Sequence, residues 1–125
     1  MTENQLSYII RGAIFEVYNH LGPGLFESVY QKVLNYELNE RGLNVLSEVT
    51  VPIFYKTEKI DAGFRIDLLV NQKVLIELKS IETLQKVHHK QVLTYLKLKN
   101  LKLGLLVNFN SNNIASSIYR KVNGL

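Results

Sequence analysis

The stretch Asp67-Leu-Leu-Val-Asn-Gln-Lys-Val-Leu-Ile-Glu77-Leu-Lys79 predicts two β-strands joined by a tight turn. The segments Phe64 to Val70 and Val74 to Lys79 are both rich in apolar and branched residues, which is typical of strands. Between them, Asn71-Gln72-Lys73 has the polar composition of a turn. This hairpin is the element around which the remaining elements are predicted.

The length of the turn determines which residues face each other across the hairpin. With three loop residues, Val70 faces Val74, and Asp67 then faces Glu77. Side chains alternate between the two faces of a strand, so one face of the hairpin is predicted to be the apolar core. That face would consist of Phe64, Ile66, Leu68, Val70, Val74, Ile76 and Leu78.

The opposite face of the hairpin brings charges together. Asp67 and Glu77 would face each other with β-carbons only about 4.5–5.5 Å apart, flanked by Arg65 and Lys79. Two carboxylates that close repel, so the pair requires a compensating positive charge. Two sources are open: the neighbouring Lys79 or Arg65, or a divalent cation such as Mg²⁺, which prefers one or two carboxylates together with water and phosphate oxygens.

Helices and one strand are predicted before the hairpin. Apolar residues recur at helical spacing from Asn4 to Leu21, and Gly22-Pro23-Gly24 ends this helix. A second helix is predicted from about Phe26 to Arg41. Leu43 to Tyr55 alternates as a strand does, and Pro52 places that strand at an edge or makes it bulged or broken.

A helix and a strand are predicted after the hairpin. The helix runs from about Leu84 to Lys99, and it would cover Leu69 and Leu75 on the charged face of the hairpin. The strand runs from Lys102 to Asn108 and is predicted to lie parallel to the strand that begins at Val74. The order of elements predicts an α/β fold with a mixed β-sheet flanked by helices, in a single domain over residues 1–125.

Further predictions concern the last helix, one turn and the tail. The apolar contacts of the last helix are expected from Val87, Val92, Leu93, Leu96 and Leu98. Lys56 to Lys59 is expected to form a turn, and the tail beyond Asn110 is expected to include a short helix.

The composition excludes some kinds of chemistry. The 125 residues include no cysteine, which excludes disulfides, cysteine-ligated zinc and thiol nucleophiles. No apolar run is long enough to cross a membrane, and the first residues lack the pattern of a signal peptide, so a cytoplasmic protein is expected. The net charge of +4 favours phosphate-rich partners.

Positive charge is concentrated in the last third of the chain. No Asp or Glu follows Glu82, whereas Lys86, Lys90, Lys97, Lys99 and Lys102 lie in and beside the last predicted helix. Two interpretations are open for these lysines: a solvated helix face, or a surface that binds the phosphates of a nucleic acid. On the second interpretation, Lys86, Lys90 and Lys97 are the candidate phosphate-binding residues.

Two motifs carry a resemblance to known proteins. Asp67, then a gap of nine residues and Glu77-Leu78-Lys79, resembles the metal-binding core of the PD-(D/E)XK nuclease superfamily. The turn Gly24-Leu-Phe-Glu27-Ser-Val-Tyr30 resembles the signature of the small GxxExxY family, which is grouped with those nucleases. The likeness runs from about residue 10 to residue 110 and implies a restriction-endonuclease-like core.

The resemblance also implies roles for residues on the helices. Glu27 would be a third carboxylate of the metal site; its alternative role is to stabilise the positive end of its own helix. Tyr30 shares a helix face with Glu27 and would help to position the substrate. Gln91 and Tyr95 resemble the Gln-x-x-x-Tyr element of the superfamily, and His88 lies on the same stripe of the helix. These three are otherwise polar groups at the edge of the core.

Together these features predict a phosphodiesterase that depends on Mg²⁺ or Mn²⁺ and acts on DNA or RNA. Asp67, Glu77, the backbone carbonyl of Leu78 and Glu27 would hold the metal ion, and Lys79 would orient or deprotonate the attacking water. The competing hypothesis is a noncatalytic module that binds nucleic acid or protein. No base-reading motif is present, so sequence specificity would require a partner or a homodimer.

Overall fold

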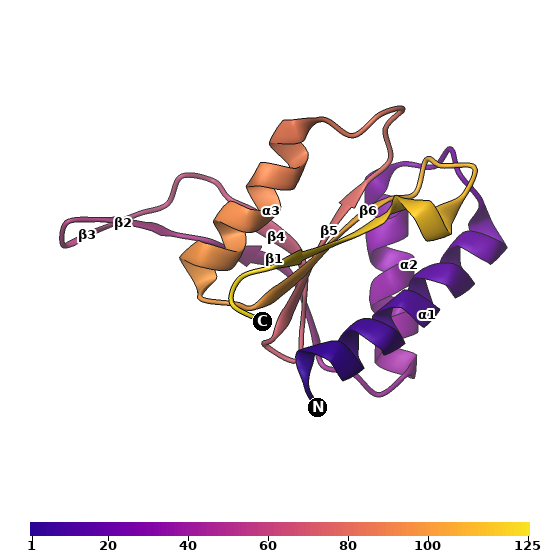
Figure 1. Ribbon diagram of the computed structural model, residues 1–125, viewed down its shortest axis with the longest axis horizontal. Helices are drawn as coiled ribbons and strands as arrows, with labels where there is room; N and C mark the ends of the chain where they lie inside the picture. The colour runs from indigo at the N-terminus through magenta and orange to yellow at the C-terminus, as the bar shows by residue number, and fades with distance from the viewer.

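The computed structural model describes all 125 residues, which form a five-stranded mixed sheet between two helical layers (Figure 1). The elements are α1 Glu3–Leu21, α2 Glu27–Glu40, β1 Val45–Thr50, β2 Ile53–Tyr55, β3 Glu58–Ile60, β4 Arg65–Val70, β5 Val74–Lys79, α3 Lys86–Lys99, β6 Leu103–Asn108, the 3₁₀ helix η1 Ile114–Ser117 and β7 Ile118–Val122. The strand order is β1-β4-β5-β6-β7, in which only β5 and β6 are parallel. The predicted α/β fold with a mixed sheet is confirmed.

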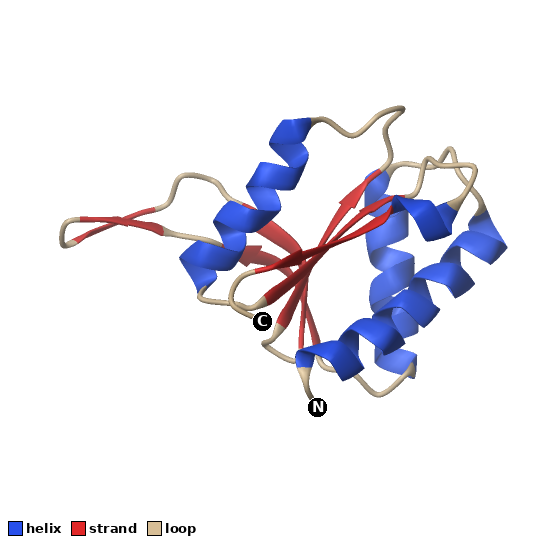
Figure 2. Cartoon of the chain, viewed as in Figure 1, coloured by secondary structure: helices blue, strands red, loops and turns tan.

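Apolar side chains on both faces of the sheet divide the core into two parts. On one face, α1 and α2 pack against the sheet, and Figure 2 shows both helices on the same side. On the other face, α3 covers Leu69 and Leu75, as predicted. A β-carbon added to Gly104 of β6 would lie only 2.8 Å from Val92 of α3, so glycine at this position allows the helix to approach the sheet closely.

The hairpin of β4 and β5 has the predicted register near its turn. Val70 pairs with Val74, and Asn71 and Gln72 in the turn both have positive φ. The ladder continues only as far as Leu68, which pairs with Ile76. Beyond that pair the two strands diverge, and Figure 1 shows β4 and β5 separating like the arms of a fork. The divergence determines the geometry of the candidate site.

The predicted face of the first strand is wrong at its beginning. Phe64 and Ile66 pack with the α3 side of the core, whereas Leu68 and Val70 pack with the α1 and α2 side. The physical reason is an irregularity in the pairing of β1 with β4, which omits Glu48 and Asp67. Glu48 has a φ of 54°, which is uncommon for a non-glycine residue and changes the local direction of the strand.

Other predicted boundaries also need correction. The strand predicted from Leu43 to Tyr55 is broken at Val51 and Pro52 into β1 and β2, which is one of the alternatives predicted for Pro52. The turn predicted over residues 56–59 is shorter, since β3 begins at Glu58. The tail forms a short helix, as expected, in the 3₁₀ helix η1, and it then adds the edge strand β7, which was not predicted.

The expected apolar contacts of α3 are partly wrong. Val87 is 64% exposed and Leu98 is 40% exposed, whereas Val92 and Leu96 are buried against the sheet. The helix begins at Lys86, later than predicted. No helix of the chain is both long enough and apolar enough to cross a membrane.

Candidate active site

The site lies where β4 and β5 diverge beyond Leu68 and Ile76, and we call this place the fork. Two carboxylates there take the place of hydrogen bonds between the strands. The backbone N–H of Asp67 donates to Glu77 Oε1 at 3.1 Å. The backbone N–H of Leu78 donates to Asp67 Oδ2 at 2.8 Å. Each acidic side chain thus satisfies a backbone amide of the opposite strand, so the carboxylates lie side by side, as the predicted register requires.

Burial makes this pair of carboxylates unusual. Glu77 is only 4% exposed, and burial together with the neighbouring Asp67 raises its pKa to about 8. Burial also raises the pKa of Asp67 to about 6, with smaller contributions from the negative charges of Glu48 and Glu27. Two buried acids that lie side by side are more stable with a shared proton or a bound cation than with two uncompensated negative charges.

One oxygen of each carboxylate remains available to a ligand. Every fully buried polar side-chain atom has a hydrogen-bond partner. Asp67 Oδ1 and Glu77 Oε2 have none, so both oxygens reach solvent. The pair therefore presents two oxygen ligands that point out of the core.

Lys79 is the positive charge that acts on the pair, although it forms no direct ion pair with it. The lysine lies one pleat beyond Glu77 on the same strand, and its charge lowers the pKa of both acids. Arg65, the other expected counter-charge, instead lies 3.4 Å from Asp61 and also donates to the backbone carbonyl of Phe64. Of the two side-chain sources considered, the arrangement supports Lys79.

Glu27 joins the site from the beginning of α2. The turn before this helix requires Gly24 at a φ of 99°, and Glu27 then lies in the first helical turn. Its Oε2 accepts a hydrogen bond of 3.2 Å from the backbone N–H of Ser80, directly after Lys79. The negative charge of Glu27 also raises the pKa of Asp67, so the predicted third carboxylate lies on the same side as the pair.

Tyr30 does not lie in the site, which corrects its predicted role in substrate positioning. The side chain is fully buried and stacks on Phe109 with ring centroids 4.3 Å apart. Its hydroxyl donates to the carbonyl of Gly22 and accepts from the N–H of Leu25. Tyr30 therefore holds the turn that places Glu27.

Sequence reasoning missed Gln31, which connects two of the acids. Its Nε2 donates to Glu48 Oε1 at 2.9 Å and to the backbone carbonyl of Asp67 at 3.3 Å. Glu48 of β1 is thereby held close enough to raise the pKa of both Asp67 and Glu77. The available signal was the spacing of Gln31, four residues after Glu27 on the same helix face.

The polar stripe of α3 reaches the site through a pair of side chains. Gln91 Nε2 donates to the Tyr95 hydroxyl at 3.0 Å. Burial, and then the negative charge of Glu77, raises the pKa of Tyr95, which places this hydroxyl near the acids. Tyr95 is 3% exposed and Gln91 is more accessible, so Gln91 is the one that can touch a substrate. His88 Nδ1 accepts the backbone N–H of Gln85 at 2.9 Å, which leaves Nε2 as a donor.

The candidate phosphate-binding lysines lie on a different side of α3. Lys86, Lys90 and Lys97 are exposed, and none of them forms an ion pair. At about 100° per residue, Tyr95 lies about 140–180° around the helix from them. These lysines therefore form an outer surface and do not line the acidic pair.

The donor set fits a small, hard cation that keeps part of its water. No group of three or more Asp, Glu, His or Cys side chains is arranged as a complete metal-binding set. Two adjacent carboxylates, each with one free oxygen, match Mg²⁺ or Mn²⁺, which bind through one or two carboxylates plus water and substrate oxygens. The roles of Glu27 and of the Leu78 carbonyl as ligands stay predictions.

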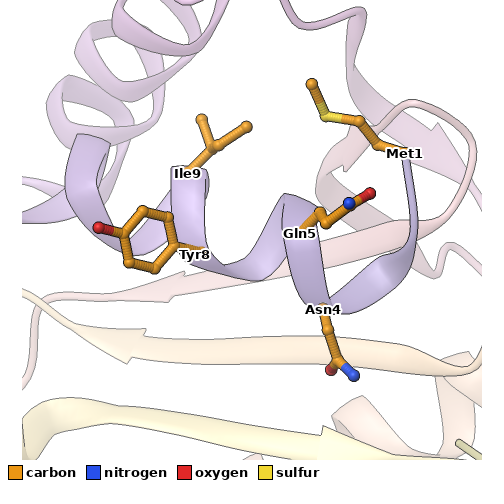
Figure 3. A pocket seen from close by; sticks show the side chains of 5 residues that line it. All are labelled: Met1, Asn4, Gln5, Tyr8 and Ile9. Atoms are coloured by element: carbon orange, nitrogen blue, oxygen red, sulfur yellow. The ribbon is translucent and has the colours of Figure 1, made fainter.

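A hollow that shares none of these residues lies along the start of α1. It measures about 570 Å³ and is lined by Met1, Asn4, Gln5, Tyr8 and Ile9 (Figure 3). Lys73, in the turn of the hairpin, donates to the carbonyl of Met1, so this hollow lies at the end of the hairpin opposite the acids. Its lining contains no Asp, Glu, His, Lys or Arg side chain, so it offers no carboxylate ligand to a cation.

The fold and the site together define an α/β protein in which a forked hairpin carries an Asp, Glu and Lys set. The chain belongs to the PD-(D/E)XK nuclease superfamily, since the family model of that description matches residues 4–121. Comparison with curated proteins finds no match, and comparison with solved structures finds none either. The narrower resemblance to the GxxExxY family stays a prediction.

Proposed function

We propose that this protein hydrolyses phosphodiester bonds of DNA or RNA with the help of Mg²⁺ or Mn²⁺. The observation that carries the proposal is the pair of buried carboxylates at the fork, each bonded to a backbone amide and each with one free oxygen. Nucleases of this superfamily generally use divalent metal ions, and their substrates are nucleic acids.

Asp67 and Glu77 would hold the ion, with Glu27 beside them. When bound, the ion supplies positive charge that polarises a phosphate and lowers the pKa of a coordinated water. The hydrogen bonds to the backbone amides fix the rotamers of both acids before any ligand arrives, so the site is preorganised.

Lys79 and Gln91 would act on the substrate directly. The ammonium group of Lys79 would orient the attacking water or neutralise charge that develops on the phosphate oxygens. Gln91, held by Tyr95, would donate a hydrogen bond to the substrate, and His88 Nε2 could donate another from the end of the same helix. The exposed lysines of α3 would attract more distant phosphates.

Cleavage of plasmid DNA, single-stranded DNA and RNA with added Mn²⁺ or Mg²⁺ tests the proposal. Asp67→Asn and Lys79→Ala should each lower the rate by at least about a hundredfold, because each removes a group that acts on the reacting phosphate. Lys73→Ala, which changes a lysine at the other end of the same hairpin, should cleave at the wild-type rate. Equal rates for all of these proteins would refute the assignment.

A noncatalytic binding module is the second candidate, because the side chains do not form a complete set of three ligands. On this hypothesis the acids would share a proton, and the fork would be a structural feature. Titration calorimetry with Mn²⁺ separates the two candidates. Heat of binding that disappears in Asp67→Asn supports the nuclease, and absence of binding together with unchanged thermal stability in chelator supports the module.

A further inference from the structure

The β2–β3 hairpin is the one part of the chain that extends away from both cores. Its strands pair only with each other and form a separate two-stranded sheet. Figure 1 shows this hairpin projecting from the body of the molecule beyond α3. Every residue of β3 is exposed, so the hairpin does not serve the packing of the fold.

Two large aromatic side chains are displayed on this hairpin. Phe54 is 65% exposed and Tyr55 is 63% exposed, although burial of such rings is strongly favourable. As successive residues of a strand, they point to opposite faces of the hairpin. A ring is therefore available on each side of the projection.

Each ring has a lysine beside it. Lys59 pairs with Phe54 across the two strands. Lys56 Nζ lies 5.6 Å from the centroid of the Tyr55 ring. Glu58 opposes Tyr55, so the segment from Ile53 to Ile60, with two lysines and one glutamate, has a net charge of +1. Aromatic rings next to cations are the combination that binds bases and phosphates of a single strand.

The base of the hairpin is connected to the candidate site. The N–H of Val51 donates to the carbonyl of Phe64 at 3.0 Å and closes the hairpin at its base. The Phe64 ring lies 5.8 Å from the ring of Tyr95, which accepts the hydrogen bond from Gln91. Asp67 follows three residues after Phe64. The base of the hairpin is thus linked, through Phe64 and Tyr95, to the side of the sheet on which the acids lie.

We propose that the β2–β3 hairpin binds single-stranded or locally unpaired nucleic acid, with Phe54 and Tyr55 stacking on bases and Lys56 and Lys59 contacting the backbone. The inference rests on the proposed nuclease function, and it adds an unpaired strand as the substrate. Only unpaired bases expose the faces on which side-chain rings can stack.

A second copy of the chain fits this surface less well. Stable protein interfaces bury about 800 Å² per partner and are depleted in lysine. The hairpin has two strands of three residues each, and its exposed rings adjoin lysines. The small area and the charge both favour nucleic acid.

Binding of a fluorescent oligonucleotide, single-stranded or annealed to its complement, tests the inference in chelator, where no cleavage occurs. The variant Phe54→Ala/Tyr55→Ala should bind the single strand at least about tenfold more weakly, because each stacked base contributes strongly to affinity. Wild type should bind the duplex more weakly than the single strand. Phe54→Trp/Tyr55→Trp should restore single-strand affinity.

Tyr36→Ala is the matched control, because Tyr36 is 66% exposed on α2, away from the hairpin. It should bind like wild type. Lys56→Gln/Lys59→Gln should reduce the dependence of log affinity on log salt by about 0.7 for each lost phosphate contact. Thermal unfolding should be unchanged in all of these variants, since the substituted side chains lie outside both cores.

The possible failures are distinguishable. Wild-type single-strand affinity in Phe54→Ala/Tyr55→Ala would overturn the inference, and cleavage by the wild-type protein would show that the proposed function survives. Hairpin-dependent binding by a protein that cleaves nothing would overturn the function and leave the hairpin inference standing. Conversion of a dimer to a monomer by the double alanine variant, with unchanged affinity, would assign the hairpin to self-association and overturn the inference.

Discussion

At the scale of single residues, Asp67 and Glu77 have both a structural and a chemical role. Each accepts a backbone N–H of the opposite strand, which holds the strands apart in a defined geometry. The same burial raises the pKa of both side chains. Near neutral pH and without a cation, the folded protein therefore retains at least one proton that the unfolded chain has already lost.

This difference predicts how stability depends on pH in chelator. The pKa of Glu77 rises from 4.5 to about 8 on folding, so the folded state binds a proton more tightly than the unfolded state. The free energy of unfolding should therefore be greatest below about pH 4.5 for this group and fall by a few kcal/mol as the pH rises through about 8. Thermal denaturation between pH 5 and 8.5 measures the effect.

Glu77→Gln is the control for this prediction. The amide keeps an oxygen that can accept the Asp67 N–H, but it has no proton to lose in this range. Its stability should change less with pH than that of wild type, and at about pH 8 in chelator it should exceed that of wild type. An equal slope for both proteins would contradict the raised pKa of Glu77.

At the scale of elements, the hairpin of β4 and β5 could be predicted from the sequence. Its register follows from the polar turn and from the alternation near Val70 and Val74, both of which are local features. The face of Ile66 could not be predicted, because it depends on the interruption of the β1–β4 pairing at Glu48, which lies on another strand. The position of Tyr30 in the core was also hidden, since its partner Phe109 is far away in the sequence.

The packing of α3 against β6 leads to a second prediction. Gly104→Ala would place a β-carbon 2.8 Å from Val92, in a region where neither the strand nor the helix can easily move. The substitution should lower the free energy of unfolding by about 1–3 kcal/mol. Urea denaturation monitored by circular dichroism provides the measurement.

Gly12→Ala is a matched comparison in α1. The added β-carbon would meet only the flexible end of Arg41, at 3.1 Å, and alanine favours the helix over glycine by about 1 kcal/mol. This variant should be as stable as wild type or more stable. A similar loss in both variants would show that tight packing at β6 is not the cause.

At the scale of the whole molecule, α3 separates two candidate surfaces. Tyr95, hydrogen-bonded to Gln91, lies near Glu77 at the fork, whereas the lysines lie on the outer side of the helix. The sequence predicted both groups, but it did not show their separation, because that depends on how the helix is rotated against the sheet. The extra strand β7 was missed for a similar reason, since its short apolar pattern also permits a helix.

The exposed lysines of α3 are predicted to affect the binding of nucleic acid and not the chemical step. Lys86→Ala/Lys90→Ala/Lys97→Ala should raise KM for nucleic acid at low salt and leave kcat nearly unchanged, because these lysines do not line the acids. The difference from wild type should shrink as the salt concentration rises. A fall in kcat with unchanged KM would instead place the lysines at the reacting phosphate.

The hydrogen bonds at the fork also restrict how this chain can change during evolution. On the proposed function, a lineage that lost nuclease activity would still need an acceptor for the Asp67 and Leu78 amides, so aspartate and glutamate, or their amides, would be retained to hold the strands. The side chain of Lys79 forms no hydrogen bond with the backbone, so Lys79 would be the first of the three residues to be substituted. In related sequences, loss of the lysine beside intact acids would therefore mark descendants that have given up hydrolysis.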